Sequence, residues 1–383
     1  MATAIYGSHA LRNLLGLNTT IVSYGENRLV ADLRTSMNAH NSAVDAMLSP
    51  FMEFSDSRLE PYGASYNQMR VRGQRVDQSG AVDTQRARPG VSESNLGFPL
   101  DRWQYAWQFT RDFVETATPA DAAVRILAIQ QGDLDRIEYE FKNAFFNPAN
   151  NLTWRDYLVD DLVLPVRRFA NADGQTLPAG PGGITFNPAT HQHYMGRAGG
   201  ALAAADYTAL INNVVEHGVA GAVQLWINMA DEPGILAMSN FYRFEATELV
   251  VPNVPAGTQV MRAPGPLTPT INPPAPDNMA IGRWNAKYDV WTKPWVPAGY
   301  AVCIDTGKRP LRWRQRARPE TGTGVGAFGR GTLRIVGEHE HFPLRAEWIE
   351  REFGLATIDR VGGAILYYGG TSYVMPTITL PAL

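Results

Sequence analysis

The sequence predicts an α+β protein in which some segments have no hydrophobic core of their own. The 383 residues are 45% apolar and 19% charged, a composition typical of globular proteins. Stretches with the helical period alternate along the chain with stretches that have a period of two, as in strands. Near the N-terminus, an amphipathic stretch and a polar hairpin pattern both require another surface to be stable.

Composition excludes several kinds of site. Cys303 is the only cysteine, which rules out an internal disulfide and a cysteine zinc cluster. The N-terminal residues lack the pattern of a signal peptide, and no apolar run is long enough to cross a bilayer, so we expect a soluble intracellular protein. The net charge of −3 gives no sign of polyanion binding. Among the 34 basic residues the lysines are only Lys142, Lys287, Lys293 and Lys308.

Residues 1–57 are predicted to form an arm with one amphipathic helix. Leu29, Leu33 and Met37 follow the helical period, and Pro50 ends the pattern. An arm this close to a terminus must bury its apolar stripe on another surface. These three residues are therefore candidates for a contact with another subunit.

Residues 58–97 resemble the two arms of a long hairpin with a tip near Ser79-Gly80. A mobile surface loop is an alternative, because the stretch contains too few apolar residues to form a core. If the hairpin lies on a neighbour, its arginines are suited to charge-assisted hydrogen bonds with carboxylates of that neighbour. The candidates are Arg70, Arg72, Arg75, Arg86 and Arg88.

A long helix is predicted from Pro119 to Phe146. Thr118 is a favourable N-cap, proline suits the first helical position, and Pro148 ends the helix. At 1.5 Å per residue such a helix is about 40 Å long, and it would lie across a sheet. Gly132 permits a bend, and Asp133 is expected on the solvated side.

The second half of the chain mixes both periods. DYTALINNVVEHG predicts a helix that stops at Gly218, and AVQLWINM predicts the strand after it. Residues 252–278 contain eight of the 26 prolines and are predicted to be an extended excursion. The stretch AILYYGGTSYVMPTITL predicts a buried strand near the C-terminus.

The stretch LRWRQRAR alternates arginine with other residues, so that four arginines share one face of a strand. Such a face could bind phosphates, but the net charge argues against a nucleic-acid site. We favour a contact with carboxylates of another chain. The candidates are Arg312, Arg314, Arg316 and Arg318.

The stretch VGEHEHFPLRAEWIEREFG is either a metal site or a charged strand that runs into a helix. His339 and His341 share one face of a strand, as in β-barrel metal sites. The pattern has a faint likeness to the cupin family, but Pro343 interrupts it and Glu347 falls in the helix-like part. No phosphate-binding loop, nucleophile elbow or H-E-x-x-H pair occurs. We expect no metal, no cofactor and no enzymatic activity.

The order of the elements resembles the major capsid protein of tailed phages, the Hong Kong 97 fold. The arm and the hairpin are followed by NLGFPLDRWQYAWQFTRDFVETATPADAAV, the α+β region, the proline-rich excursion, KPWVPAGYAVCIDTGKRPLRWR and EREFGLATIDRVGGAILYYGGTSY. The resemblance implies an N-terminal arm and an extended loop with the bounds given above. It also implies a peripheral domain with the long spine helix, over 98–200 and 339–383, and an axial domain over 201–338.

The resemblance implies a shell protein that assembles through pentamers and hexamers around the double-stranded DNA of a tailed bacteriophage. Expected partners are copies of the chain itself, a portal, a separate scaffolding protein and decoration proteins where a shell has them; contacts with DNA would not be sequence-specific, and there is no membrane. The location would be the virion capsid, assembled in the host cytoplasm. Some relatives cross-link a loop lysine to a neighbour, but no lysine precedes Lys142, so we expect a noncovalent shell. Alternatives are an encapsulin-like compartment and a metal-dependent β-barrel enzyme that uses His339 and His341.

Overall fold

The computed structural model describes residues 14–48, 52–55, 59–62, 94–156, 162–199, 202–243, 280–314, 334–341 and 344–380. They form two compact units, and both units draw on separate stretches of the chain. Unit 1 comprises residues 1–191, 309–360 and 377–383, and unit 2 comprises 192–308 and 361–376. Helices and sheets occur in both, which confirms the predicted α+β class.

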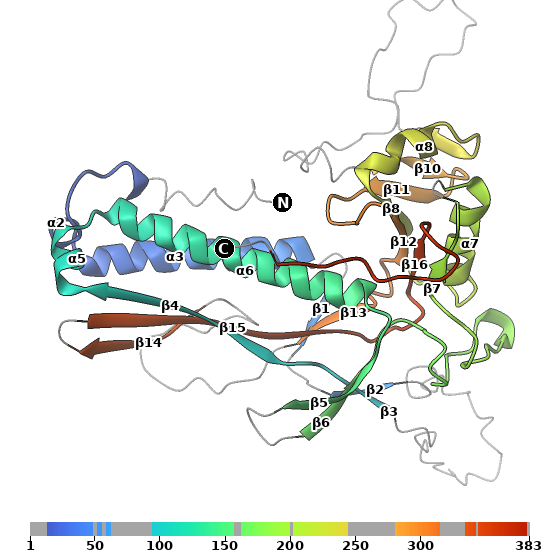
Figure 1. Ribbon diagram of the computed structural model, residues 1–383, viewed down its shortest axis with the longest axis horizontal. Coiled ribbons are helices and arrows are strands. Elements are labelled where there is room, and N and C mark those ends of the chain that lie inside the picture. The colour runs from blue at the N-terminus through green and yellow to red at the C-terminus, as the bar shows by residue number, and fades with distance from the viewer. Residues whose placement is uncertain are drawn as a thin grey trace, which may run out of the picture. The chain divides into compact units, whose positions relative to one another are not determined.

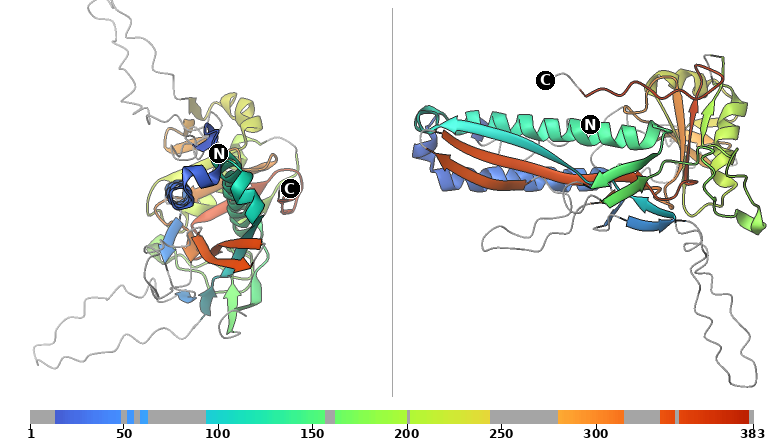
Figure 2. Two further views of the ribbon diagram at one scale, coloured as in Figure 1. Left: turned by 90° about the vertical axis from the view of Figure 1, so that its left-hand side faces the viewer. Right: turned by 60° about the horizontal axis from the view of Figure 1, so that its bottom comes forward.

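Two long helices of unit 1 lie side by side along its largest sheet (Figures 1 and 2). They are α3 (Glu26–Leu48), which is the predicted arm helix, and α6 (Pro119–Phe146), which is the predicted spine helix. Thr118 caps α6 through a reciprocal pair of bonds with Asp121, and Asn147 ends the helix. The short helices α2 (Ile21–Tyr24) and α5 (Arg111–Thr116) contact each other beside them.

The largest sheet of unit 1 is organised around β15 (Leu344–Thr357). The strand order is β1 (Met52–Ser55), β13 (Leu311–Arg314), β15 and β14 (Arg334–His341), and β4 (Asp101–Thr110) also pairs with β15. The predicted helix in LRAEWIEREFG is therefore wrong. Its residues have good helix propensity, but β4 and β14 form ladders along this stretch, and such tertiary contacts override propensity.

Two small sheets also lie in the described part of unit 1. The strands β2 (Leu59–Tyr62) and β3 (Ser94–Gly97) pair antiparallel, with Leu59 opposite Gly97 and Tyr62 opposite Ser94. This pair holds together the two ends of the predicted extended loop, whose intervening residues 63–93 lie outside the described residues. The second pair is β5 (Asn151–Asp156) with β6 (Leu162–Val166).

Unit 2 contains a seven-stranded mixed sheet. Its order is β7 (Tyr194–Gly196), β16 (Gly363–Tyr367), β12 (Tyr300–Asp305), β8 (Val223–Ile227), β11 (Tyr288–Thr292), β10 (Ala280–Trp284) and β9 (Phe241–Arg243). The helix α7 (Ala204–Val215) packs on β16, β12 and β8, and α8 (Glu232–Leu236) lies beside β9. The 3₁₀ turns are Pro181–Gly183 in unit 1 and Met229–Asp231 in unit 2.

The core of unit 2 lies between α7 and the sheet. Tyr207 of α7 packs against Trp284 of β10, with ring centroids 5.1 Å apart. The predicted helix and strand in this region are confirmed, and Gly218 follows the helix with a φ of 82°. No helix among the described residues is long and apolar enough to cross a membrane.

The division into units differs from the expected domain boundaries at three places. Residues 192–199, which include β7, belong to unit 2, where β7 pairs with β16. The C-terminal strand β16 pairs with β12 in unit 2, and not with the elements around the spine helix. Residues 309–338 belong to unit 1, because β13 and β14 both pair with β15. All three differences come from strand pairings between distant parts of the chain.

Candidate assembly interfaces

Seven of the predicted contact residues cannot be placed. The hairpin arginines and the last two arginines of the alternating stretch lie outside the described residues, and they stay predictions. They are Arg70, Arg72, Arg75, Arg86, Arg88, Arg316 and Arg318.

The arm stripe does not face outwards, and the expectation that it needs a second subunit is wrong. Leu29, Leu33 and Met37 are only 4 to 5% exposed. They pack in one cluster with Ala122 and Ile126 of α6, together with other residues of unit 1. The stripe is satisfied within the chain because the spine helix lies beside the arm.

The same stripe continues into a buried row of polar residues. His40 follows Met37 at the helical spacing, and on α6 Gln130 and Asp133 follow Ile126 in the same way. Gln130 Nε2 donates to Ser36 Oγ at 2.9 Å. A polar residue on a buried stripe signals an internal partner, so this signal was available in the sequence.

Asp133 is the centre of this row. One carboxylate oxygen lies 2.7 Å from Nε2 of His40, and the other accepts from Nε of Arg351 at 2.7 Å. A second guanidinium nitrogen of Arg351 donates to Asn41 Oδ1 at 2.8 Å. The arm helix, the spine helix and the sheet are thus joined by one buried network. The prediction that Asp133 is solvated is wrong, because the side chain is buried between His40 of the arm and Arg351 of β15.

The electrostatics of this network favour the charged form of the carboxylate. Burial by itself would raise the pKa of Asp133, but the positive charge of Arg351 and the hydrogen bonds from His40 and Arg351 hold it below its usual value. Removing one partner of such a buried pair leaves an uncompensated charge, which costs far more than losing a surface ion pair. The network therefore holds the arm helix in one position on the spine.

The arginines of β13 are also buried within the chain. Arg312 is 5% exposed and Arg314 is fully buried, so the described part of the alternating stretch offers no arginine face to another chain. The guanidinium of Arg314 lies 4.7 Å from the ring centre of Phe98. On the other side of the strand, Trp313 stacks on Phe353 with ring centroids 4.2 Å apart. The strands β1 and β15 pair with the two edges of β13, and its faces are covered by side chains such as Phe98 and Phe353.

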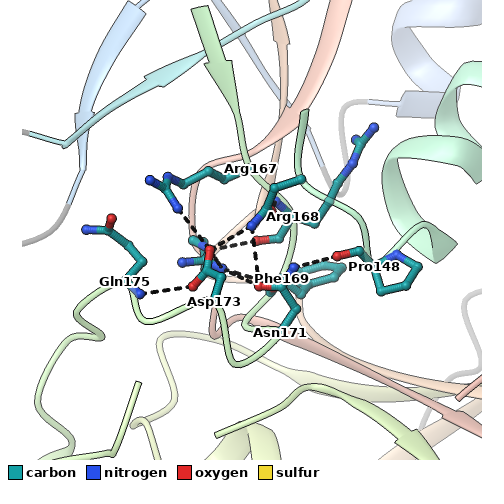
Figure 3. Close-up of polar contacts among 9 residues, drawn as sticks. Pro148, Arg167, Arg168, Phe169, Asn171, Asp173 and Gln175 are labelled. Carbon is teal, nitrogen blue, oxygen red and sulfur yellow. Dashed lines mark hydrogen bonds and ion pairs between the residues drawn. The ribbon is translucent and has the colours of Figure 1, made fainter. Parts of the chain in front are cut away.

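A second network of polar contacts includes Arg167, Asn171 and Asp173, which Figure 3 shows, and the side chain of Arg360. The side chain of Arg360 is fully buried, and its Nε donates to the carbonyl of Arg168 at 2.7 Å. Its Nη2 donates to Asn171 Oδ1 at 2.9 Å and to Asp173 Oδ2 at 2.8 Å. Arg167 donates to the same oxygen of Asp173 at 2.9 Å.

The pKa of Asp173 shows how this second network is balanced. Burial acts to raise it, whereas Arg360, Arg167 and the backbone N–H of Gln175 hold it below its usual value. The long connection between β6 and β7 is therefore fixed to the end of β15 by charge-assisted hydrogen bonds. Sequence spacing gave no signal for this pairing.

The strand register argues against a metal site built from His339, His341 and Glu347. His339 pairs with Ala346 and His341 with Leu344, whereas Glu347 pairs with Glu338. Paired residues share a face of a sheet and successive residues alternate, so residue 347 lies on the face opposite to residues 339 and 341. This register removes the carboxylate that the metal hypothesis required.

Exposed apolar side chains mark other surfaces in the described part of the chain. On the hairpin β5–β6, Leu152 is 45% and Val163 is 41% exposed. On β9, Tyr242 is 56% exposed, and within the described residues this strand pairs with β10 alone. An unpaired sheet edge next to an exposed aromatic residue is a surface that another chain can cover.

Comparisons with known proteins were made for the whole chain. No family model and no curated protein match the sequence. A solved structure from Mycobacterium phage Patience matches with a TM-score of 0.60 and 19% identity over 94% of this chain and 93% of that chain. The capsid asymmetric unit of cyanophage A-1(L) matches with a TM-score of 0.42 and 13% identity over 86% of this chain and 93% of that chain. The encapsulin of Synechococcus elongatus PCC 7942 matches with a TM-score of 0.40 and 10% identity over 86% and 90%.

The likeness to the mycobacteriophage structure covers nearly all of both chains and shows a shared fold. The predicted resemblance to the Hong Kong 97-type capsid fold is thereby confirmed.

Proposed function

We propose that this chain is the major subunit of a capsid shell, assembled through pentamers and hexamers into an icosahedral particle around the double-stranded DNA of a tailed bacteriophage. The observation that carries the proposal is the shared fold with a phage structure over 94% of the chain. The role is structural and not enzymatic. The partners are other copies of the chain, a portal, a separate scaffolding protein and decoration proteins where present, and the packaged DNA is held without sequence-specific contacts.

Assembly in this proposal uses surfaces that the chain does not cover itself. The arm helix is already fixed on the spine helix by the network around Asp133. The contacts between subunits are then left to the extended loop, with its arginines from Arg70 to Arg88, and to surfaces such as the β5–β6 hairpin. Head-to-tail contacts of this kind close into rings where the rotation permits.

The shell is held without covalent cross-links. A lysine amine is required for an isopeptide bond from the extended loop, and no lysine precedes Lys142. Particles boiled in detergent should therefore run as single chains on a denaturing gel. A ladder of cross-linked chains would contradict this part of the proposal.

Electron microscopy of the chain, expressed alone and with candidate scaffolding proteins, tests the proposal directly. Closed icosahedral shells, and nuclease-protected DNA in particles from infected cells, are the expected results. Shells that enclose an enzyme cargo would instead identify a compartment protein of the encapsulin type. A compact monomer under every assembly condition would refute the proposal.

The remaining alternative, an enzyme that uses His339 and His341, predicts that alanine at both positions abolishes a catalytic activity. A structural role predicts instead that the double variant still assembles into shells. The double variant should therefore form particles in the same yield as the wild type.

A further inference from the structure

Two histidines of unit 2 come together at the end of helix α7. His193 precedes β7, and His217 follows α7. His193 is fully buried, and the side chain of His217 is 1% exposed. Their Nε2 atoms lie 3.2 Å apart, and the ring planes are inclined by 38°. Neither residue belongs to the surfaces described above.

The hydrogen bond on the far side of His193 sets its tautomer. Nδ1 of His193 lies 2.7 Å from the carbonyl oxygen of Gly363. A carbonyl only accepts, so Nδ1 carries the hydrogen and donates it. The neutral imidazole then directs the lone pair of Nε2 towards His217. Metal-binding histidines are typically oriented in this way, by donating the other ring N–H to a backbone carbonyl.

The distance between the two nitrogens matches a shared metal ion. Zinc binds imidazole nitrogen at about 2.0–2.1 Å with tetrahedral geometry, which places two such nitrogens about 3.3–3.4 Å apart. The observed 3.2 Å is close to this value. A direct N–H···N hydrogen bond is the competing explanation, although 3.2 Å is at the long end for one with an N–H donor.

Glu216, the residue before His217, has 41% of its side chain exposed, and its Oε1 lies 3.9 Å from Nε2 of His217.

We propose that Nε2 of His193 and Nε2 of His217 bind a divalent transition-metal ion of the zinc type. Nitrogen-rich sites favour such ions over Mg²⁺ or Ca²⁺. The bound ion would connect the end of α7 to the start of β7 and, through Gly363, to β16. Its role is structural, and it does not depend on the proposed shell function.

Titration of the metal-free full-length chain with Co²⁺ tests the site, since cobalt reports tetrahedral coordination through its visible absorption. The wild type should bind one equivalent, and Zn²⁺ should displace it. At about 100 times Kd, Zn²⁺ should also raise the Tm of the unit by about 5–10 °C. His217→Gln should abolish both effects while circular dichroism shows an unchanged fold.

His341→Ala is the matched control, because it removes a histidine from the competing candidate on β14. Stoichiometric binding that survives in this variant and is lost in His217→Gln supports the proposal. No tetrahedral cobalt signal in the wild type, or its loss in the control alone, overturns it and leaves a hydrogen-bonded pair.

Discussion

Replacing Asp133 with asparagine should release the arm helix from the spine. The substitution keeps the size and shape of the side chain but removes its charge. Arg351 is 2% exposed and the side chain of His40 is fully buried, so neither can turn to solvent when the carboxylate is lost. The guanidinium then remains buried without its counter-charge, which is the costly outcome for a buried ion pair.

The size of the effect follows from which bonds survive. Breaking a buried ion pair costs about 3–5 kcal/mol. The asparagine oxygen can still accept from Nε of Arg351, so the lower end, about 3 kcal/mol, applies. For a folding unit of roughly 150–250 residues this lowers Tm by about 6–12 °C. A double variant with Arg351→Met should recover part of the loss, because the buried positive charge is then gone as well.

Differential scanning calorimetry measures the shift, and hydrogen exchange in α3 shows whether the arm is released. Asp135→Asn is the matched control, since it makes the same change two residues along α6, where the side chain is only partly buried and bonded to Gln131. The control should change stability by no more than about 0.5 kcal/mol. Equal shifts in the two variants, or unchanged protection of α3, would show that the network does not hold the arm.

The effect of Asp133 on stability also has a predicted pH range. Its pKa is lower in the folded chain than in the unfolded chain, where a carboxyl titrates near about 3.9. The stabilisation is therefore present above about pH 4 and is lost as the pH falls further. The difference between the wild type and Asp133→Asn should narrow in the same range.

Three further substitutions test other parts of the structure. Burial raises the pKa of Asp101 to about 6, above its value in the unfolded chain. The wild type should therefore lose stability as the pH rises from about 4 to about 6, where the buried carboxyl becomes ionised. The Asp101→Asn variant should lack this loss and should melt at a higher temperature than the wild type at pH 8. Arg360→Lys replaces a fork of donors with one ammonium group, and it should cost about 2–3 kcal/mol, seen as a lower Tm; an unchanged Tm would show that one nitrogen suffices. Gly97→Ala would place Cβ 2.5 Å from Cβ of Leu164 and should lower the free energy of unfolding in chemical denaturation by about 1–3 kcal/mol. Gly234→Ala in α8 meets no atom within 4 Å and should leave the free energy of unfolding unchanged or raise it by up to about 1 kcal/mol.

Local sequence signals predicted the elements whose ends are set by residues close to them in the sequence. The spine helix begins and ends where its cap and prolines place it, because Thr118 and Asn147 act through neighbours within four residues. The stretch from Leu344 to Gly354 was assigned to the wrong state for the opposite reason. Its leucine, alanine, glutamate and arginine residues favour a helix, and only its pairing with β4 and β14 makes it a strand.

The buried networks depend on residues that are far apart in the sequence. His40 and Asp133 are separated by 93 positions, and Asp133 and Arg351 by 218. Period and composition can show that His40 and Asp133 fall on apolar stripes, but not which residue meets them. Arg314 was also assigned wrongly. Its place in the alternating stretch predicted a side chain that faces another chain, but in the structure the guanidinium lies against the ring of Phe98 in the same chain.

The intrachain docking of the arm changes how the cost of assembly is distributed. A segment that becomes ordered only on a neighbour loses its conformational entropy when the subunits associate, and this loss weakens binding. The helix α3 loses this entropy already when the chain folds, because Leu33, Met37 and His40 are buried against the spine helix of the same chain. In the proposed assembly, the free energy of association between subunits is therefore not reduced by ordering the arm. The same network makes the arm responsive to acid, because its anchor is a carboxylate that must stay ionised.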